Sequence, residues 1–376
     1  MKKTPEELAG MVINLDPDCL TLDMTCSLLN IFPTDDDMKL IRSADQSKLD
    51  IGCRLFQELN KIDRCKIRLE CHEIIFSFQN IYSTVNSRFN IIQNACEELN
   101  KIKNEMESIF SIVLAIGNYL NCDNKWGQAY GFQIESLNKL STLKASPISL
   151  GTAVNIVATL IEQKSPNCIK ISDQTMAISA ASEVSYRQLT SDLNILEQQM
   201  AKVENEYQLS KGRNDRGMRL LCQRLEQFLG TAKPKLTNIK MQSKSVEANL
   251  AQIMKFYGDN LVKLCEEDAS QCFFKTLSSF FRSLRLAADE NAKKKKDEEK
   301  ELSKNKVTVK FLDEKEARKS FKPRPKLSRM ATKENIFDNF HNDHDAKTDA
   351  IVAEFMMKQH RLLIFMQKEL IYVMCT

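Results

Sequence analysis

The sequence contains few of the residues that make tight turns. Its 376 residues include only 10 glycines and 8 prolines. Sheet-rich folds need many tight turns, so this scarcity argues against them and favours an all-α fold. No apolar run approaches the roughly 18 residues that span a bilayer, and the first residues, MKKTPEELAG, lack the apolar core of a signal peptide. We therefore expect a cytoplasmic chain with no transmembrane segment.

Residue patterns typical of metal and enzyme sites are also scarce. Twelve cysteines are present, but no two have the C-x-x-C spacing of zinc or redox sites, so we expect reduced thiols. His341 and His344 lie close together without further ligands nearby. With four histidines, no glycine-rich phosphate loop and no nucleophile motif, we expect neither enzymatic activity nor a cofactor or metal. The formal net charge of +4 does not indicate a nucleic-acid partner.

Apolar residues at helical spacing occupy most of the chain. Thr34 followed by Asp37 predicts a capping box at the start of a helix over 34–48, and further helices are expected over 51–63 and 150–164. One apolar stripe has steps of three and four: Ile92, Ala95, Leu99, Ile102, Met106, Ile109, Val113 and Ile116. We expect residues 5–290 to be almost entirely helical, with the longest helices over about 85–117 and 180–210.

A second stripe is equally regular. It comprises Tyr186, Leu189, Leu193, Leu196, Met200, Val203 and Tyr207. Three heptads are compatible with a coiled coil to another chain, but they are marginal alone, so packing within the chain's own bundle is the favoured interpretation. Further helices are expected from Met218 until the sequence GTAKPK at 230–235, from Val246 to Leu264, and from Phe273 to Ala287.

The composition changes after residue 292. Lysine and arginine predominate from Lys293, apolar periodicity is lost, and Pro323 and Pro325 oppose helix formation. Three regions are therefore predicted: a helical domain over 1–292, a basic disordered linker over 293–335, and an apolar helical tail over 336–376. Within the tail, the stretch 351–374 either packs on the bundle or binds a partner or a membrane surface.

One short stretch does not fit a plain helical bundle. Residues 117–132, GNYLNCDNKWGQAYGF, hold three of the ten glycines and the only tryptophan. A helix end explains Gly117 and Asn118, because both residue types suit the left-handed conformation that often follows a helix. It does not explain the second group, Ala129 to Phe132.

These residues resemble the signature of the formin homology 2 domain. The matching positions are Gly117-Asn118-Tyr119-Leu120-Asn121, a short loop, Gly127-Gln128-Ala129-Tyr130-Gly131-Phe132, and then SLNKLSTLK. The family pattern is Gly-Asn-Tyr-Met-Asn, a loop, Gly-x-Ala-Tyr-Gly-Phe-Lys, then Leu-x-Lys-Leu-x-Asp-x-Lys. The likeness extends over about 5–300, and the Dishevelled-associated subgroup is the one that it most resembles.

The resemblance implies a surface, called the post, that receives the lasso of a second subunit beside the glycine-rich motif. Its expected members are Gly117, Asn118, Tyr119, Asn121, Trp126, Gly127, Ala129, Tyr130, Gly131 and Phe132. The family forms a two-subunit ring that nucleates actin filaments and stays on the barbed end. Expected actin-binding positions are Gln133, Lys139 and Lys144. Actin, as monomer and as filament barbed end, is the implied partner, and a second formin chain is the implied partner of the post.

Several positions depart from the family pattern. Gln133 stands where the family usually has a lysine, Thr142 replaces an aspartate, and Trp126 occupies an arginine position. The sequence begins after the expected lasso and first knob helix, so we expect a mainly monomeric chain with reduced nucleation. The alternative is a non-enzymatic helical scaffold or negative regulator that binds other formins or a non-actin partner.

Overall fold

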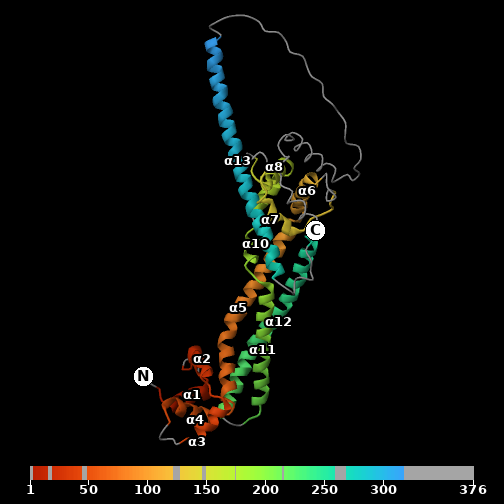
Figure 1. Cartoon of the computed structure of the whole chain (residues 1–376). Helices are drawn as coiled ribbons and strands as arrows, with labels where there is room; N and C mark the ends of the chain where they lie inside the picture. Colours follow the sequence, from red (N-terminus) through yellow and green to blue (C-terminus); the bar gives the residue numbers. More distant parts are fainter. Residues whose placement is uncertain are drawn as a thin grey trace. The chain divides into compact units, whose positions relative to one another are not determined.

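The computed structural model describes residues 3–15, 19–44, 49–121, 128–145, 150–173, 175–213, 216–258 and 268–316. In these ranges the regular structure is helical, apart from one isolated antiparallel bridge between Lys144 and Thr152. The expected all-α class is confirmed (Figure 1). The chain divides into two units: Met1–Gln93 with Val184–Asn249, and Asn94–Glu183 with Leu250–Thr376.

The first unit combines four short helices with long ones. The short helices are α1 (Pro5–Asn14), α2 (Leu22–Asn30), α3 (Asp35–Ser43) and α4 (Ile51–Asn60). The long ones are α11 (Tyr186–Ser210) and the larger parts of α5 (Cys65–Lys101) and α12 (Arg216–Phe256). Side-chain caps start each short helix. The predicted capping box of Thr34 and Asp37 is confirmed at α3, and Thr4 with Glu7 forms another at α1.

The regular stripe of α11 lies inside the first unit. Tyr186, Leu189, Leu193, Leu196, Met200 and Val203 are all buried. Ion pairs flank this seam between α11 and its neighbours, as in Lys202–Glu70 at 2.5 Å and Arg88–Asp192 at 3.2 Å. The stripe therefore packs within the chain's own bundle, as the favoured interpretation predicted.

A buried arginine connects three segments of the first unit. Arg68 on α5 is 1% exposed and donates to the carbonyl oxygens of Ile13 at 3.1 Å and Gly217 at 3.0 Å. The first carbonyl lies in the last turn of α1 and the second in the first turn of α12. Carbonyls at the C-terminal end of a helix have no partner within that helix, so Arg68 satisfies one of them and holds α1 against α5.

The second unit contains the candidate site and its support. Its helices are α6 (Lys103–Leu120), η2 (Ile134–Ser136), α7 (Leu137–Leu140), α8 (Ala153–Lys164), α9 (Pro166–Ile169), η4 (Lys170–Asp173), α10 (Met176–Ala181) and α13 (Ala269–Glu316). Helix α8 packs on α13, where phenylalanines 273, 274, 280 and 281 are fully buried. The polar pair Asn155 and Asn291 lies within this interface, and the Asn291 amide donates to the Asn155 carbonyl at 2.8 Å.

Helix boundaries differ in several places from those that the sequence predicted, and three of these differences change whole elements. The stripe from Ile92 to Ile116 is divided between α5 and α6 at Ile102, whose ψ of 15° departs from helical geometry. Helix α12 continues through Pro234, although the 230–235 sequence predicted an end there. Buried residues on both sides, Leu229 and Ile239, explain this continuity, because their packing outweighs one hydrogen bond lost at proline. The longest helices are therefore α13 and α12.

The third difference concerns the predicted linker. Helix α13 continues to Glu316, so residues 293–316 are helical rather than disordered. Lysine and glutamate are strong helix formers, which favours this extension even though Lys293 to Glu301 are exposed. The remainder of the predicted linker and the tail, including the stretch 351–374, His341 and His344, lie outside the described residues.

Candidate functional site

The site begins at the end of α6, where Asn118 clamps the returning chain. The Asn118 amide nitrogen donates to the Ala129 carbonyl at 3.0 Å, and the Ala129 amide donates to Asn118 Oδ1 at 2.8 Å. One side chain thus satisfies both backbone groups of a residue 11 positions later. This pairing joins the two halves of the glycine-rich motif. Trp126 and Gly127 lie between them, outside the described residues.

The residues around Asn118 line the helix end. Gly117 is buried and Tyr119 is half-buried. Asn121 is 1% exposed, and its backbone amide donates to the Gly117 carbonyl at 3.1 Å. Neither polar atom of the Asn121 side chain has a hydrogen-bond partner within the described residues. The Asn121 amide is therefore a buried polar group at this helix end whose hydrogen-bonding capacity the described residues do not use.

Phe132 anchors the far end of the motif in an aromatic cluster. Its ring lies 5.4 Å from that of Phe110 on α6, and the Phe110 ring lies 5.7 Å from that of Tyr257. Tyr257 also lies 5.8 Å from Phe273 on α13. Burial raises the pKa of the Tyr257 hydroxyl well above its usual value. Sequence reasoning missed Phe110 and Tyr257 as supports, although both lie within predicted helices.

Between its two anchors the motif is open. The side chain of Tyr130 is fully exposed. Gly131 has no positive φ, and a Cβ added to it would meet no atom within 4 Å. Neither backbone geometry nor packing within the described structure therefore requires glycine at 131. A glycine that its own fold does not require leaves room for the close approach of another molecule.

The three candidate actin-binding residues follow in the next segment. Gln133 is exposed just before η2, Lys139 is half-buried on α7, and Lys144 is exposed at the bridge to Thr152. This segment is held on α13 by Asn138, whose amide donates to Thr276 Oγ1 at 3.2 Å. Gln133, Lys139 and Lys144 thus follow one another along this segment, before η2, on α7 and at the bridge to Thr152.

The described residues contain no group of three or more His, Cys, Asp or Glu arranged to hold a metal ion. Nine cysteines in the described ranges are free thiols. No helix there is both long and apolar enough to cross a bilayer. The described side chains of the candidate site include the Asn118 amide, the Phe132 ring and Lys139.

Comparison with known proteins identifies the family. The model of the Formin Homology 2 Domain matches residues 1–285. The chain belongs to the formin homology 2 family. Relatives include Formin-like protein 14 of Arabidopsis thaliana, 26% identical over 82% of this chain and 25% of the relative. Disheveled-associated activator of morphogenesis 1-A of Xenopus laevis is 25% identical over 77% of this chain and 27% of the relative.

Protein diaphanous homolog 3 of Homo sapiens is 24% identical over 79% of this chain and 24% of the relative. The chain thus spans about a quarter of the length of these formin relatives. Their identities are nearly equal, so membership of the Dishevelled-associated subgroup stays a prediction. Assignment of the formin post to residues 117–132 also stays a prediction. What the structure gives for this motif is the contact of Asn118 with Ala129 and that of Phe132 with Phe110.

Proposed function

We propose that this formin homology 2 chain is an actin-binding, formin-type protein that acts on filament barbed ends in the cytoplasmic actin cytoskeleton. It acts by holding partners, not by bond chemistry. The proposal rests on the exposed residues of the glycine-rich motif between Asn118 and Phe132. Asn118 and Phe132 hold its ends, while Tyr130 and Gly131 face open space. An exposed aromatic ring beside a small residue is suited to receiving another chain.

The lasso-receiving role predicts a specific ligand, which is a peptide that copies a formin lasso and carries its tryptophan. An indole that enters beside Gly131 needs the space that a side chain there would occupy. Gly131→Val should therefore weaken peptide binding by roughly 5- to 150-fold, the range that overfilling a packed site produces. Because a Cβ at 131 meets nothing in the chain itself, thermal unfolding of Gly131→Val should match that of wild type, which separates lost binding from lost folding.

Actin contact is proposed for Lys139, Lys144 and the position of Gln133. Lysine side chains offer three donors and a positive charge, whereas the Gln133 amide is neutral. We therefore propose that the chain promotes filament assembly less strongly than formins with a lysine at that position. Gln133→Lys should raise activity, and the double variant Lys139→Ala with Lys144→Ala should lower it.

A pyrene-actin assembly assay with the purified chain tests this proposal. Lys255→Ala is the matched control, because Lys255 is an exposed lysine on α12 outside the candidate segment. Equal assembly rates for wild type, the double lysine variant and the Lys255 control would contradict actin contact through residues 139 and 144.

A second candidate function is that of a scaffold or negative regulator. The neutral Gln133 favours this second function. A chain that lacks a lysine at this actin-binding position but still receives a lasso would occupy another formin without assisting actin assembly. In that case the lasso peptide binds, actin assembly by the chain alone stays at the background rate, and addition of the chain slows assembly by a complete formin.

A further inference from the structure

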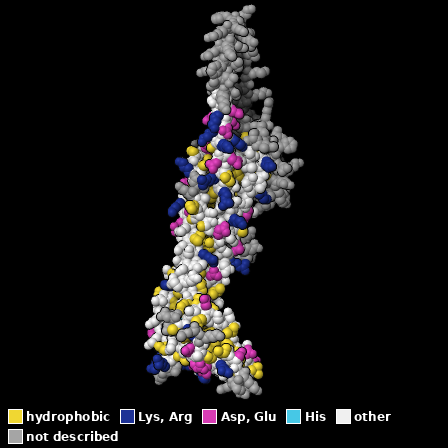
Figure 2. Space-filling view, turned by 90° about the vertical axis from the view of Figure 1, so that its left-hand side faces the viewer, with side chains coloured by type: hydrophobic (Ala, Val, Ile, Leu, Met, Phe, Trp, Pro, Cys, Tyr) yellow, Lys and Arg dark blue, Asp and Glu magenta, His cyan; other side chains and the backbone are white. Residues whose placement is uncertain are grey.

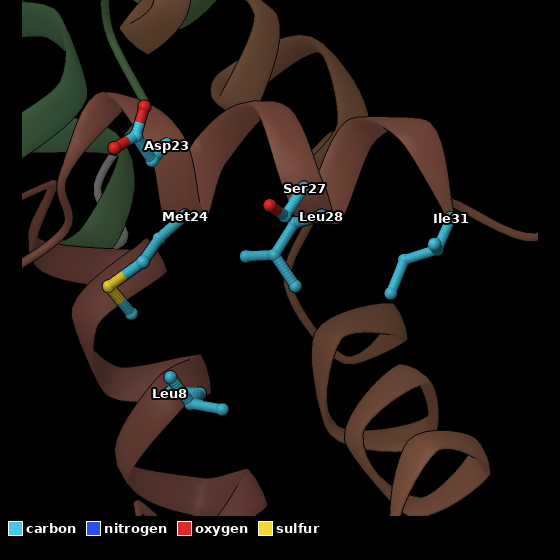
Figure 3. Close-up of a pocket in the computed structure, with 6 residues that line it drawn as sticks. All are labelled: Leu8, Asp23, Met24, Ser27, Leu28 and Ile31. Atoms are coloured by element: carbon cyan, nitrogen blue, oxygen red, sulfur yellow. The ribbon is translucent and has the colours of Figure 1, made fainter.

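An apolar groove of about 280 Å³ lies between α1 and α2 of the first unit. Its apolar lining consists of Leu8 on α1, Met24 and Leu28 on α2, and Ile31, the residue that follows α2. Figure 3 shows Leu8 opposite Met24 and Leu28, with Ile31 at the C-terminal end of α2 and Asp23 at the other end. Residues 24, 28 and 31 have helical spacing and therefore form one stripe along α2.

Ile31 is the exposed member of the stripe, whereas Met24 is half-buried and Leu28 is buried. Thr25, on another face, is fully buried and hydrogen-bonds to His72 of α5 at 3.0 Å. The residue after Ile31, Phe32, packs edge-on against Phe56 of α4 with ring centroids 5.8 Å apart. Since these contacts fix the rotation of α2, Ile31 points outward and is 62% exposed.

The elements that line the groove carry charge of one sign. Helices α1 and α2 carry Glu6, Glu7 and Asp23 and no lysine or arginine. Helix α3 begins with Asp35, Asp36 and Asp37, of which Asp36 pairs with Lys39, and Arg42 lies in its last turn. Asp23 precedes the stripe, and the three aspartates of α3 follow it by a few residues. In Figure 2, hydrophobic side chains reach the surface at the lower end of the view, over α1–α4.

We propose that this groove binds the apolar face of a positively charged amphipathic helix from a separate polypeptide. A helix that places leucine-like side chains at i, i+3 or i+4, and i+7 matches the stripe from Met24 to Ile31. Lysines or arginines flanking that face meet Asp23 and the aspartates of α3. The flexible thioether of Met24 adapts to different side chains, which suits a groove that accepts a class of helices. This binding does not depend on the proposed actin activity.

The test uses a designed peptide of about 18 residues, long enough to hold a helix, with a leucine stripe and lysines on its other faces. A second peptide keeps the leucines and has glutamate in place of each lysine. Titration calorimetry with the full chain should show binding of the lysine peptide, weaker binding at high salt, and no binding of the glutamate peptide.

Two variants locate the binding. Ile31→Ser removes the exposed anchor, and Ser27→Arg places bulk and positive charge at the groove, so each should weaken binding by about tenfold or more. Both original side chains are exposed, so the fold should tolerate these changes. Leu40→Ser is the matched control, because Leu40 is 68% exposed on α3 and does not line the groove; its affinity should equal that of wild type.

Three outcomes would overturn the proposal. The first is no binding of the lysine peptide, and the second is equal affinity for the Ile31→Ser, Ser27→Arg and Leu40→Ser chains. The third is sedimentation that shows wild-type self-association abolished by Ile31→Ser, which would assign the groove to a second copy of this chain.

Discussion

Asn118 and Ala129 exchange two hydrogen bonds across 11 residues of sequence, at 3.0 and 2.8 Å. The amide of one side chain therefore replaces the backbone partner that a sheet would have supplied to Ala129. This contact turns the end of α6 and the following motif into one surface. It also makes the geometry of that surface depend on a single side chain.

Asn118→Ala should loosen the motif without unfolding the second unit. Loss of two partly buried hydrogen bonds should lower the free energy of unfolding by about 1–3 kcal/mol, and binding of the lasso peptide should weaken. Asn118→Asp is the control, because its carboxylate still accepts from the Ala129 amide but cannot donate to the Ala129 carbonyl. Denaturant unfolding and peptide titration should rank wild type, Asp and Ala in that order; equal peptide affinity for all three would contradict the clamp.

The Arg64–Glu206 ion pair should be far more important for stability than an exposed pair. Arg64 Nη2 lies 2.6 Å from Glu206 Oε2, Arg64 Nε donates to both carboxylate oxygens, and Glu206 is 1% exposed. Arg64→Ala leaves a buried carboxylate unpaired and should cost about 3–5 kcal/mol. Lys39→Ala, which breaks the exposed Lys39–Asp36 pair, should cost at most about 1 kcal/mol. Urea unfolding of both variants measures the contrast, and similar midpoints would show that burial of Glu206 has no such consequence.

Acid should destabilise the contact between α2 and α5 through His72. Burial lowers the pKa of His72 from 6.5 to about 4, with Arg224 as a smaller cause. The Thr25 hydroxyl donates to the Thr21 carbonyl and so accepts from His72 Nδ1, while Nε2 has no partner within the described residues. Protonation of Nε2 would therefore bury a charge with no acceptor.

The sign of this effect follows from a folded-state pKa below the unfolded value. The contribution of His72 to the free energy of unfolding is fully present above pH 6.5 and decreases as the pH drops towards 4. Below pH 4 this loss amounts to about 3 kcal/mol. Thermal unfolding of wild type and His72→Gln across this range isolates the contribution, because other groups titrate alike in both. A constant difference between the two curves would contradict it.

Gly151 should be the least replaceable of three glycines. Its φ is +81°, and a Cβ added to it would lie 2.5 Å from Asn155 Oδ1, which accepts from the Thr152 amide at the start of α8. Gly151→Ala should cost about 2–4 kcal/mol, the combined effect of left-handed backbone and overpacking. Gly212→Ala, with φ +87° and free space, should cost about 1–2 kcal/mol, and Gly131→Ala close to nothing. Calorimetric melting of the three variants checks this order, and an equal loss at Gly151 and Gly212 would show that Asn155 moves aside.

Periodicity and capping chemistry predicted much of the secondary structure because both are local. The stripe from Tyr186 to Val203 and the pair Thr34 and Asp37 needed no knowledge of distant residues. The glycine-rich motif was equally visible, since unusual residue types stand close together in the chain. The helix through Pro234 was mispredicted because burial of Leu229 and Ile239 on other helices outweighs the local signal of proline.

The sequence by itself determined the helical class, the family signature and the residues of the motif, since these depend on side-chain type and spacing. Only tertiary structure decided how the motif is held. Asn118 reaches Ala129, Phe132 joins Phe110, and Phe110 joins Tyr257, which lies more than a hundred positions away in the chain. The groove beside Ile31 was likewise decided by packing. The rotation of α2 is set by the contact of Thr25 with His72, and no pattern within α2 states which of its faces stays exposed.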